Sequence, residues 1–327
     1  MKRPKAPAKV DEFDLIARLL RPLAEGAPEA LELMDDAAVL KARPGEDLVI
    51  STDMMVEGVH FLPSDPMDQV ARKLLRTNLS DLAAKAAEPY GYFLSIAWPA
   101  RCDWSAREAF AKGLAQDQAQ FGVKLLGGDT TSTPGPLTAN VTILGRVPET
   151  RTVLRSGAKA GDVVLVSGVI GDGWLGLQAA LAGLQSAALV RYRLPEPRLE
   201  LRDALRQFAH AAADVSDGLI ADAGHIAEAS GLGLELDLDR TPLSPEGRAH
   251  VDQADDRMAA LLDLAAGGDD YEVVCTISPG HVAAAIARAQ ASGLALTAVG
   301  RMVEGQGTRV FFQQREIRVE RAGYRHT

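Results

Sequence analysis

ISTDMMVEGVHF, at Ile50–Phe61, sets an aspartate among serine, threonine and glycine at the end of an apolar run. Five more segments place an aspartate in the same way, beside glycine, serine, threonine or a second acid. They are LMDDAAVL (Leu33–Leu40), NLSDLAAKA (Asn78–Ala86), LLGGDTTSTPGP (Leu125–Pro136), DVSDGL (Asp214–Leu219) and AAGGDDYE (Ala265–Glu272). Such similar contexts around acids that are far apart in the chain indicate one shared site. Small neighbours leave the backbone there open to close approach by a large ligand.

Clustered carboxylates repel one another, by about 4 kcal/mol for a pair about 4 Å apart at an effective dielectric constant of about 20. Divalent cations overcome that repulsion, and the hard oxygen atoms of aspartate suit Mg²⁺. The net charge of −9 argues against a nucleic-acid partner, since no region concentrates Lys and Arg. It does not exclude an anionic substrate, because bound metal ions reverse the local charge. The pattern predicts a magnesium-dependent enzyme that handles phosphoryl groups.

The composition is that of a globular protein with two domains. The chain has 327 residues, of which 47% are hydrophobic and 24% charged, and this length is comfortable for two cores. The composition changes around Pro148–Gly161, which contains Pro, Gly, Ser and scattered Arg, so we expect domains at 1–148 and 149–327. Cys102 and Cys275 have neither CxxC nor zinc-site spacing, which favours a reduced compartment. The basic start MKRPKAPAKV is followed by no apolar signal region, and we expect a cytoplasmic protein.

Hydrophobic periodicity predicts alternating helices and strands in both halves, and thus an α/β fold. Helices are expected at 12–23, 66–86, 105–121, 173–184, 198–209 and 219–230. Strands are expected at 37–40, 47–52, 92–98, 123–126, 137–147, 162–167, 213–215 and 234–238, and the segments 258–265, 271–276, 281–291 and 296–301 continue the alternation. Ser51–Asp53 and Gly127–Asp129 then fall at the carboxyl ends of strands, where the ligands of α/β proteins gather.

Simpler explanations exist for each motif taken alone. A single aspartate beside glycine is more often a turn residue or a helix cap than a ligand, and Asp217 could cap the helix that follows it. This explanation weakens because six segments would need it. His60 follows Asp53 within a glycine-containing turn, and a packing role is as plausible for it as a binding role. His225 lies in an apolar helix, and we interpret it as structural.

The ordinary phosphate-binding devices are missing. The sequence has no G-x-x-x-x-G-K-[ST] and no Gly-Lys dipeptide, which excludes a P-loop. Gly171–Gly176 fits G-x-G-x-x-G, but the chain continues into a second helix where a dinucleotide fold needs a parallel strand and an acid. We therefore interpret it as a glycine turn between a strand and a helix. Ser80 and Ser216 lack a G-x-S-x-G elbow, so nucleophilic catalysis has little support.

Six ordered segments carry a resemblance to the thiamine-monophosphate kinase family. They are STDMMVEGVHF, NLSDLAAKAAEP, LLGGDTT, LRSGAKAGD, DVSDGLIAD and GGDDYE. This family belongs to an ATP-dependent superfamily with aminoimidazole ribonucleotide synthetase and selenophosphate synthetase. The likeness runs from about Phe13 to Cys275, and the motifs are specific only as a set. It implies direct in-line transfer of the γ-phosphoryl group of ATP to thiamine monophosphate, with several Mg²⁺ ions and no phosphorylated enzyme.

The resemblance also implies a role for each motif residue. Metal ligands would be Asp36, Ser51, Thr52, Asp53, Asp81, Asp129, Asp214 and Asp217. ATP would contact Gly128, Asp129, Arg155 and Ser216, with Asp217 and Arg155 as the catalytic residues. Thiamine monophosphate would face His60, Asp269 and Tyr324. The family further implies a homodimer, in which the metal- and ATP-binding domain 1–148 contributes strands to a shared β-barrel. Domain 149–327 would be a mixed sheet covered by helices that completes the site.

Three positions depart from the family pattern. Met34 stands where many relatives have glycine, and Asp269 where glutamate is common. Arg321 takes the place of a tryptophan that relatives use against the thiamine rings, and Tyr324 is the nearest candidate to replace it. Two other functions stay open at this point. One is another superfamily member, such as aminoimidazole ribonucleotide synthetase, and the other is a magnesium–nucleotide binding protein without catalysis.

Overall fold

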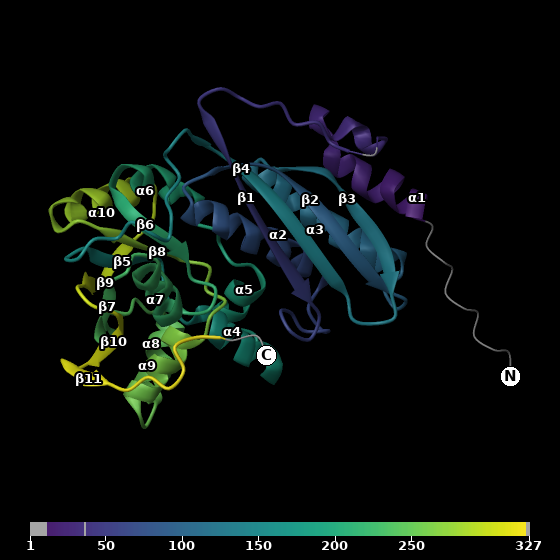
Figure 1. The fold of residues 1–327 in the computed structure, drawn as a ribbon. Helices are drawn as coiled ribbons and strands as arrows, with labels where there is room; N and C mark the ends of the chain where they lie inside the picture. The colour runs from purple at the N-terminus through teal and green to yellow at the C-terminus, as the bar shows by residue number, and fades with distance from the viewer. Residues whose placement is uncertain (1–11, 36, 325–327) are drawn as a thin grey trace, which may run out of the picture. The chain divides into compact units, whose positions relative to one another are not determined.

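The computed structural model describes residues 12–35 and 37–324, which divide into two compact units (Figure 1). One unit comprises Met1–Asn78 and Pro89–Arg146, and the other comprises Leu79–Glu88 and Val147–Thr327. The second unit therefore includes a segment, Leu79–Glu88, that precedes residue 148 in the chain. Asp81 lies in this segment and so belongs to the second unit.

Among the described residues, the first unit contains one sheet, with the strand order β1-β4-β2-β3. Its strands are β1 (Glu46–Val56), β2 (Glu88–Pro99), β3 (Lys124–Thr133) and β4 (Thr138–Pro148). Because β2 and β3 run parallel, a crossover must join them, and α3 (Trp104–Phe121) provides it. The Asp103 side chain accepts from the N–H of Ala106 at the start of α3, and Gly122 ends the helix with a φ of 69°.

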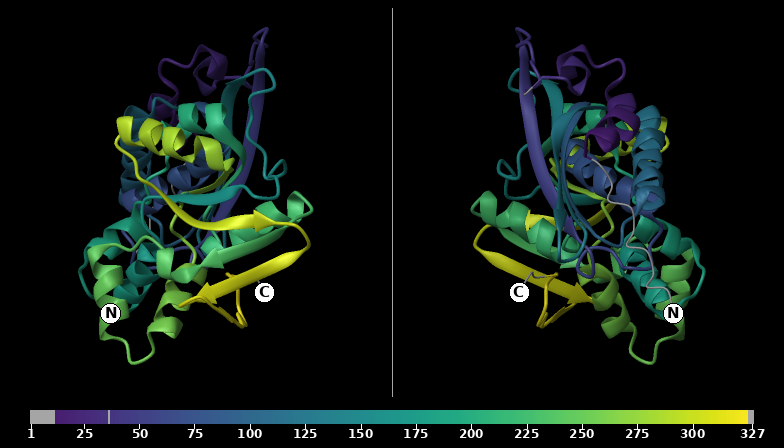
Figure 2. Two further views of the ribbon diagram at one scale, coloured as in Figure 1. Left: turned by 90° about the vertical axis from the view of Figure 1, so that its left-hand side faces the viewer. Right: turned by 90° about the vertical axis from the view of Figure 1, so that its right-hand side faces the viewer.

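Helices α2 (Met67–Ala84) and α3 lie on one face of this sheet (Figures 1 and 2). The two helices approach so closely that a Cβ on Gly113 would stand 2.1 Å from the carbonyl oxygen of Asp68. Only glycine fits there. Trp98 of β2 meets Phe110 of α3 edge to face, with ring centroids 5.4 Å apart. The aromatic pair joins the crossover helix to the sheet.

In the part of the chain that the structure describes, the second unit contains a mixed sheet of order β11-β10-β7-β9-β5-β8-β6. Its strands are β5 (Val163–Ser167), β6 (Ala209–Asp214), β7 (Gly233–Asp237), β8 (Val273–Ile277), β9 (Leu296–Val303), β10 (Gly307–Phe312) and β11 (Arg315–Ile317). β7 and β10 are parallel, whereas β5 is antiparallel to both β8 and β9. Figure 2 shows β7 between β9 and β10.

Helices cover both faces of the second sheet. They are α4 (Asp172–Ala182), α5 (Ala187–Arg193), α6 (Arg202–Phe208), α7 (Leu219–Ala229), α8 (Pro245–Gln253), α9 (Arg257–Ala266) and α10 (Val282–Ala291). Alternate residues of the central strands enter two separate cores. Val164 and Val166 of β5 join the core that α7 and α9 complete, whereas Leu165 joins the one that α6 and α10 complete. Burying such a side chain contributes about 1.5–3 kcal/mol.

Most expected helices and strands are confirmed, with ends shifted by a few residues. Residues 37–40 form no strand, because the N–H of Val39 donates to the carbonyl of Glu29, 2.9 Å away, rather than to a neighbouring strand. The opening helix is also interrupted: α1 (Glu12–Leu15) passes into a π-helical turn and then a 3₁₀ turn at Arg21–Ala24. Pro22 has no N–H to continue an α-helix. The elements α5, α8, β10 and β11 were not expected.

Two expectations about strand ends are wrong. β1 and β3 continue beyond the predicted ends, so Ser51–Asp53 and Gly127–Asp129 lie inside strands and not at their carboxyl ends.

Cys102 and Cys275 are buried free thiols. Within the described ranges, no single helix has the length and apolar character to cross a membrane, and the bent pair α4 and α5 passes that test only jointly.

Candidate functional site

Two acidic motifs form one structure at the end of strands β6 and β8. These strands are antiparallel neighbours, with Asp214 opposite Val273. Beyond them, the N–H of Val215 donates to the carbonyl of Glu272, and the N–H of Tyr271 donates back to the carbonyl of Val215, both at 2.8 Å. The pairing therefore continues out of the sheet into the D-V-S-D-G-L and G-G-D-D-Y-E loops.

The next hydrogen bond holds Asp269 against the other loop. Its N–H donates to the carbonyl of Ser216 at 2.8 Å. A Cβ on Gly268, whose φ is +76°, would lie 2.6 Å from that same carbonyl oxygen. Glycine at 268 thus allows both the turn and the close approach. In consequence, Asp269 stands beside Ser216 and Asp217, as the sequence motifs alone could not show.

Asp214 is the most buried member of the expected site, at 4% exposure, and its Oδ2 accepts from the Ser80 hydroxyl at 3.0 Å. Lys85, from the same segment as Ser80, donates its ammonium to a backbone carbonyl of β6 at 2.9 Å. The pKa of Lys85 is lowered to about 8, chiefly by burial and also by the charge of Arg155, while Asp214 and Asp81 oppose the decrease. These four charged groups therefore lie within electrostatic reach of one another. Lys85 was not among the expected site residues.

A tight turn presents Asp217 at the start of α7. The Oδ2 of Asp222 accepts from the N–H groups of Asp217 and Gly218, at 3.0 and 3.2 Å. The other carboxylate oxygen of Asp222 lies 3.5 Å from Nδ1 of His225, and hydrogen bonding to Asp222 raises the pKa of His225. The side chain of His225 is 45% exposed, and its contact is with Asp222, the residue that holds the turn. The Asp-x-x-His spacing on one helix was the signal for this pair.

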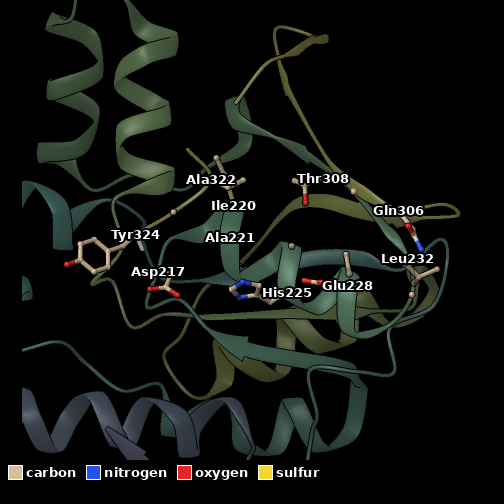
Figure 3. A pocket seen from close by; sticks show the side chains of 15 residues that line it. Asp217, Ile220, Ala221, His225, Glu228, Leu232, Gln306, Thr308, Ala322 and Tyr324 are labelled. Carbon is tan, nitrogen blue, oxygen red and sulfur yellow. The ribbon is translucent and has the colours of Figure 1, made fainter. Parts of the chain in front are cut away.

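A cavity of about 760 Å³ opens beside this turn (Figure 3). α7 forms one wall, and β10 with the C-terminal segment forms the other. Asp217 and Tyr324 lie at one end, where the N–H of Tyr324 donates to the carbonyl of Asp217 at 2.9 Å. His225 and Glu228 line the middle. The guanidinium of Arg321 lies 5.9 Å from the centre of the Tyr324 ring, within the range of a cation–π interaction.

In the first unit, the strand β1 presents its three expected ligands to two different faces. Ser51 and Asp53 share the half-buried face, whereas Thr52 is on the exposed face. The N–H of Asp53 donates to Oδ1 of Asn78 at 3.1 Å, and its carbonyl accepts from the Asn140 amide at 3.2 Å. The hydroxyl of Thr52 also bonds the Asn140 side chain. The backbone around Asp53 is thereby fixed from both sides.

His60 lies in the loop after β1, and its ring is oriented by the backbone. Its Nδ1 accepts from the N–H of Val56 at 3.0 Å, so this nitrogen is unprotonated in the bond. Its carbonyl accepts from the Lys73 ammonium at 3.1 Å. These contacts hold His60 at a set angle to the end of β1.

Asp129 and Gly128 lie exposed within β3. Gly128 has a φ of +151°, and a Cβ there would be 1.8 Å from the carbonyl oxygen of Leu94 on β2, so no other residue fits. Both residues line a cavity of about 550 Å³ whose apolar wall includes Ile16 and Leu20. β1 and β3 are the two edge strands of this sheet. Three inter-strand spacings, or roughly 14 Å, therefore separate the strand of Asp129 from the strand of Asp53.

The expected residues thus divide into two groups according to the unit they belong to, apart from Asp36, which lies outside the described residues. The group in the first unit is Ser51, Thr52, Asp53, His60, Gly128 and Asp129, and the group in the second unit is Asp81, Arg155, Asp214, Ser216, Asp217, Asp269 and Tyr324. Among described residues, no three His, Cys, Asp or Glu side chains form a ready-made metal cluster. The donor atoms of both groups are nevertheless mainly hard carboxylate and hydroxyl oxygens, which is the chemistry that Mg²⁺ prefers.

Comparisons with known proteins identify relatives of this chain. The model of the AIR synthase related protein N-terminal domain matches residues 34–147, and that of the C-terminal domain matches residues 159–313. A thiamine-monophosphate kinase of Caulobacter vibrioides is 55% identical over 98% of this chain and 92% of its own length. The crystal structure of a thiamine-monophosphate kinase from Stenotrophomonas maltophilia matches with a TM-score of 0.82 and 36% identity, over 92% of this chain and 96% of that one.

A further solved structure, AaThiL complexed with AMPPCP and TMP, matches with a TM-score of 0.75 and 28% identity, over 89% of this chain and 91% of that one. The two domain models match consecutive parts of the chain, and the sequence identity and the structural similarity each extend over nearly all of it. This chain therefore belongs to the thiamine-monophosphate kinase family of AIR synthase related proteins.

Proposed function

We propose that this chain transfers the γ-phosphoryl group of ATP to thiamine monophosphate, which yields thiamine diphosphate, in a reaction that requires Mg²⁺. The observation that carries the proposal is the 55% identity to a thiamine-monophosphate kinase over 98% of the chain. The solved AaThiL complex contains AMPPCP, an ATP analogue, together with TMP. Transfer between two phosphates depends on positioning and charge neutralisation more than on a strong base. The joined loops at Ser216 and Asp269 offer such a rigid frame.

The metal ions would be held by the acids of both groups. The proposed ligands are Asp36, Ser51, Thr52, Asp53, Asp81, Asp129, Asp214 and Asp217. Mg²⁺ usually takes one or two carboxylates and completes its shell with water and substrate phosphates, so no single cluster of three acids is needed. When bound, it would neutralise the charge of the two polyphosphate reactants. Because Thr52 faces away from Ser51 and Asp53, its contribution would be its carbonyl oxygen.

The nucleotide contacts follow from charge and shape. Gly128 and Asp129 border the cavity of about 550 Å³, whose apolar wall suits a purine base and whose acidic end suits a metal-bound phosphate. Arg155 would supply the fixed positive charge for the transferred phosphoryl group, with Asp217 and the Ser216 hydroxyl beside it. Lys85 lies within electrostatic reach of Arg155 and adds to the positive charge.

The acceptor would use the cavity beside α7. Its Asp217 end suits a phosphate held through a metal ion, and Asp269 stands next to Ser216 on the joined loop. Thiamine carries a cationic thiazolium ring, which the face of Tyr324 and the carboxylate of Glu228 could attract. His60 is proposed as a further contact to thiamine monophosphate.

The active protein would be cytoplasmic, where its two buried thiols stay reduced.

We also propose a homodimer in which the sheet of the first unit joins that of a second copy into a β-barrel. β1 is an edge strand of this sheet. Its outward face presents Leu48, Ile50 and Met54, which are 45%, 61% and 53% exposed. An exposed, long and apolar edge strand is a template for pairing with another chain. A second copy would cover that face.

One assay tests the proposed reaction. Purified protein, ATP, Mg²⁺ and thiamine monophosphate are mixed, and thiamine diphosphate is identified by chromatography and mass. We expect product that depends on all three additions and none when formylglycinamidine ribonucleotide replaces thiamine monophosphate. Turnover of that substrate would favour an aminoimidazole ribonucleotide synthetase. ATP binding without either product would leave a nucleotide-binding protein that lacks catalysis.

A further inference from the structure

The G-G-D-D-Y-E loop has an uncommon backbone. Asp269 has a φ of 62° and Tyr271 a φ of 52°, so two residues other than glycine adopt the left-handed conformation on either side of Asp270. L-residues avoid this region, and such outliers persist only when surrounding contacts hold them. The hydroxyl of Tyr271 donates to the Asp269 carboxylate at 3.1 Å. Two strained residues in one short loop mean that contacts with the surrounding structure must hold the backbone that presents Asp269.

Asp270 is one such anchor. Its side chain is buried, and its Oδ1 accepts from the N–H groups of Gly171 and Gly173, at 3.0 and 2.9 Å. Its Oδ2 also accepts from Gly171 at 2.9 Å. The contacts join the loop to the start of α4. They leave no spare room, because a Cβ on Gly173 would stand 2.5 Å from the carbonyl carbon of Asp269.

Glu272 is the second anchor. It is fully buried, and Arg198 forms two hydrogen bonds to its carboxylate, at 2.6 and 2.5 Å. The Ser167 hydroxyl donates to the same carboxylate at 2.6 Å and itself accepts from the N–H of Val273 at 2.8 Å. A paired and hydrogen-bonded buried carboxylate resists displacement. Both ends of the segment that contains Asp269 are thus fixed.

From this geometry we propose that Asp270 is a positioning residue for the acceptor, because its buried Oδ1 holds the left-handed backbone on which Asp269 meets Ser216. The inference rests on the proposed kinase function for its kinetic consequence alone. The role depends on an acceptor atom and not on negative charge. Asparagine at 270 keeps an Oδ1 that can accept from both Gly171 and Gly173 and loses only the second contact of Gly171, to Oδ2, whereas alanine removes all three contacts.

The test compares Asp270→Ala with Asp270→Asn. We expect Asp270→Ala to raise the KM for thiamine monophosphate about tenfold, the effect of losing one to two hydrogen bonds. Asp270→Asn should stay within about threefold of the parent value. Asp162→Ala is the matched control. Its buried carboxylate accepts from the N–H of Lys159, in the same unit but at the far end of β5 from Ser167. That variant should lose stability and keep the parent KM.

A second variant disturbs the loop without touching Asp270. Gly173→Ala places a methyl group 2.5 Å from the Asp269 carbonyl carbon, so the backbone of Asp269 must shift and the same KM should rise; the helix propensity of alanine offsets part of that strain. This variant decides the matter if Asp270→Ala does not fold. An unchanged KM in Gly173→Ala, or an equal loss in Asp270→Asn and Asp270→Ala, would overturn the proposal. So would a similar rise in Asp162→Ala.

Hydrogen exchange separates failure of this inference from failure of the proposed reaction. The N–H of Asp269 is bonded to Ser216, so the peptide at 267–272 should exchange slowly in the parent and in Asp270→Asn. It should exchange at least about tenfold faster in Asp270→Ala. This readout needs no substrate, and it stands even if the parent makes no thiamine diphosphate. Equal exchange in all three proteins contradicts the positioning role.

Discussion

At the level of single residues, the aspartates of this chain differ in what their carboxylates accept. Asp222 and Asp270 accept backbone N–H groups of tight turns, and Asp214 accepts the Ser80 hydroxyl. Such contacts fix a local structure. Asp81 is half-buried and Asp129 is exposed, and the motifs around both are those of the proposed metal site. Asp222, Asp270 and Asp214 should therefore determine the shape of the site, whereas Asp81 and Asp129 should determine its charge.

A charge-neutralising substitution should separate these two roles. Asp81→Asn and Asp129→Asn keep the side-chain volume but remove one negative charge each, so we expect kcat to fall about 100-fold. Their unfolding free energies should change by no more than about 0.5 kcal/mol. Steady-state assays over a Mg²⁺ titration, with urea unfolding alongside, measure both quantities. Asp255→Asn, at an exposed loop position, is the control. A parent-like kcat in either site variant would remove that residue from the metal set.

The lowered pKa of Lys85 predicts the direction in which the folding stability of the protein changes with pH. Its pKa of about 8 in the folded protein lies below the ordinary lysine value of 10.5, chiefly because of burial. Between these values the unfolded chain binds more protons than the folded one, so the contribution of Lys85 to stability rises with pH. It is lost as pH falls towards 8. Without metal, the parent should gain up to about 1.4 kcal/mol per pH unit relative to Lys85→Met in this window. Parallel stability curves from urea unfolding in EDTA would contradict this.

At the level of elements, the sequence predicted those that carry local signals. α3 has an aspartate cap and a terminal glycine, and its bounds were placed within one residue. Residues 37–40 have strand-like composition, but the N–H of Val39 donates to the carbonyl of Glu29 and not to a neighbouring strand. β11 is short, and β10 has no alternation of exposed and buried residues over its first half. Such edge strands depend on partners far along the chain, which periodicity does not encode.

The exposed face of β1 supports a prediction at this level. Ile50 is 61% exposed at an edge strand, so a charge there should cost little in an isolated chain. In the proposed dimer, Ile50→Arg would bury an unpaired charge in two copies and weaken association at least about 100-fold. Sedimentation velocity over a dilution series measures the change. Val39→Arg, at an exposed residue outside the strand, is the control. An Ile50→Arg protein that associates as the parent does would exclude this face.

At the level of the whole molecule, the motifs gave the residues of the site but not their partners. The order of the motifs was sufficient to indicate the family, since six segments had to agree. Nothing in the sequence showed that Ser80 bonds Asp214, or that Asp270 holds the start of α4. These contacts join residues that are 134 and 97 positions apart in the sequence. Local patterns carry no information about them, because their geometry follows from how the second sheet assembles.

The charge of the whole chain sets the last prediction. With a net charge of −9 and aspartates in both groups of site residues, the protein should repel a polyphosphate that arrives without metal. A ligand that binds only the folded state stabilises it, by about 2.7 kcal/mol at 100 times its dissociation constant. AMPPCP with Mg²⁺ should therefore raise the midpoint of thermal unfolding, while AMPPCP with EDTA should not. Mg²⁺ alone is the control, and Asp129→Asn should reduce the shift. Equal stabilisation by AMPPCP in EDTA would show that the nucleotide binds without the metal ions that the acids are proposed to hold.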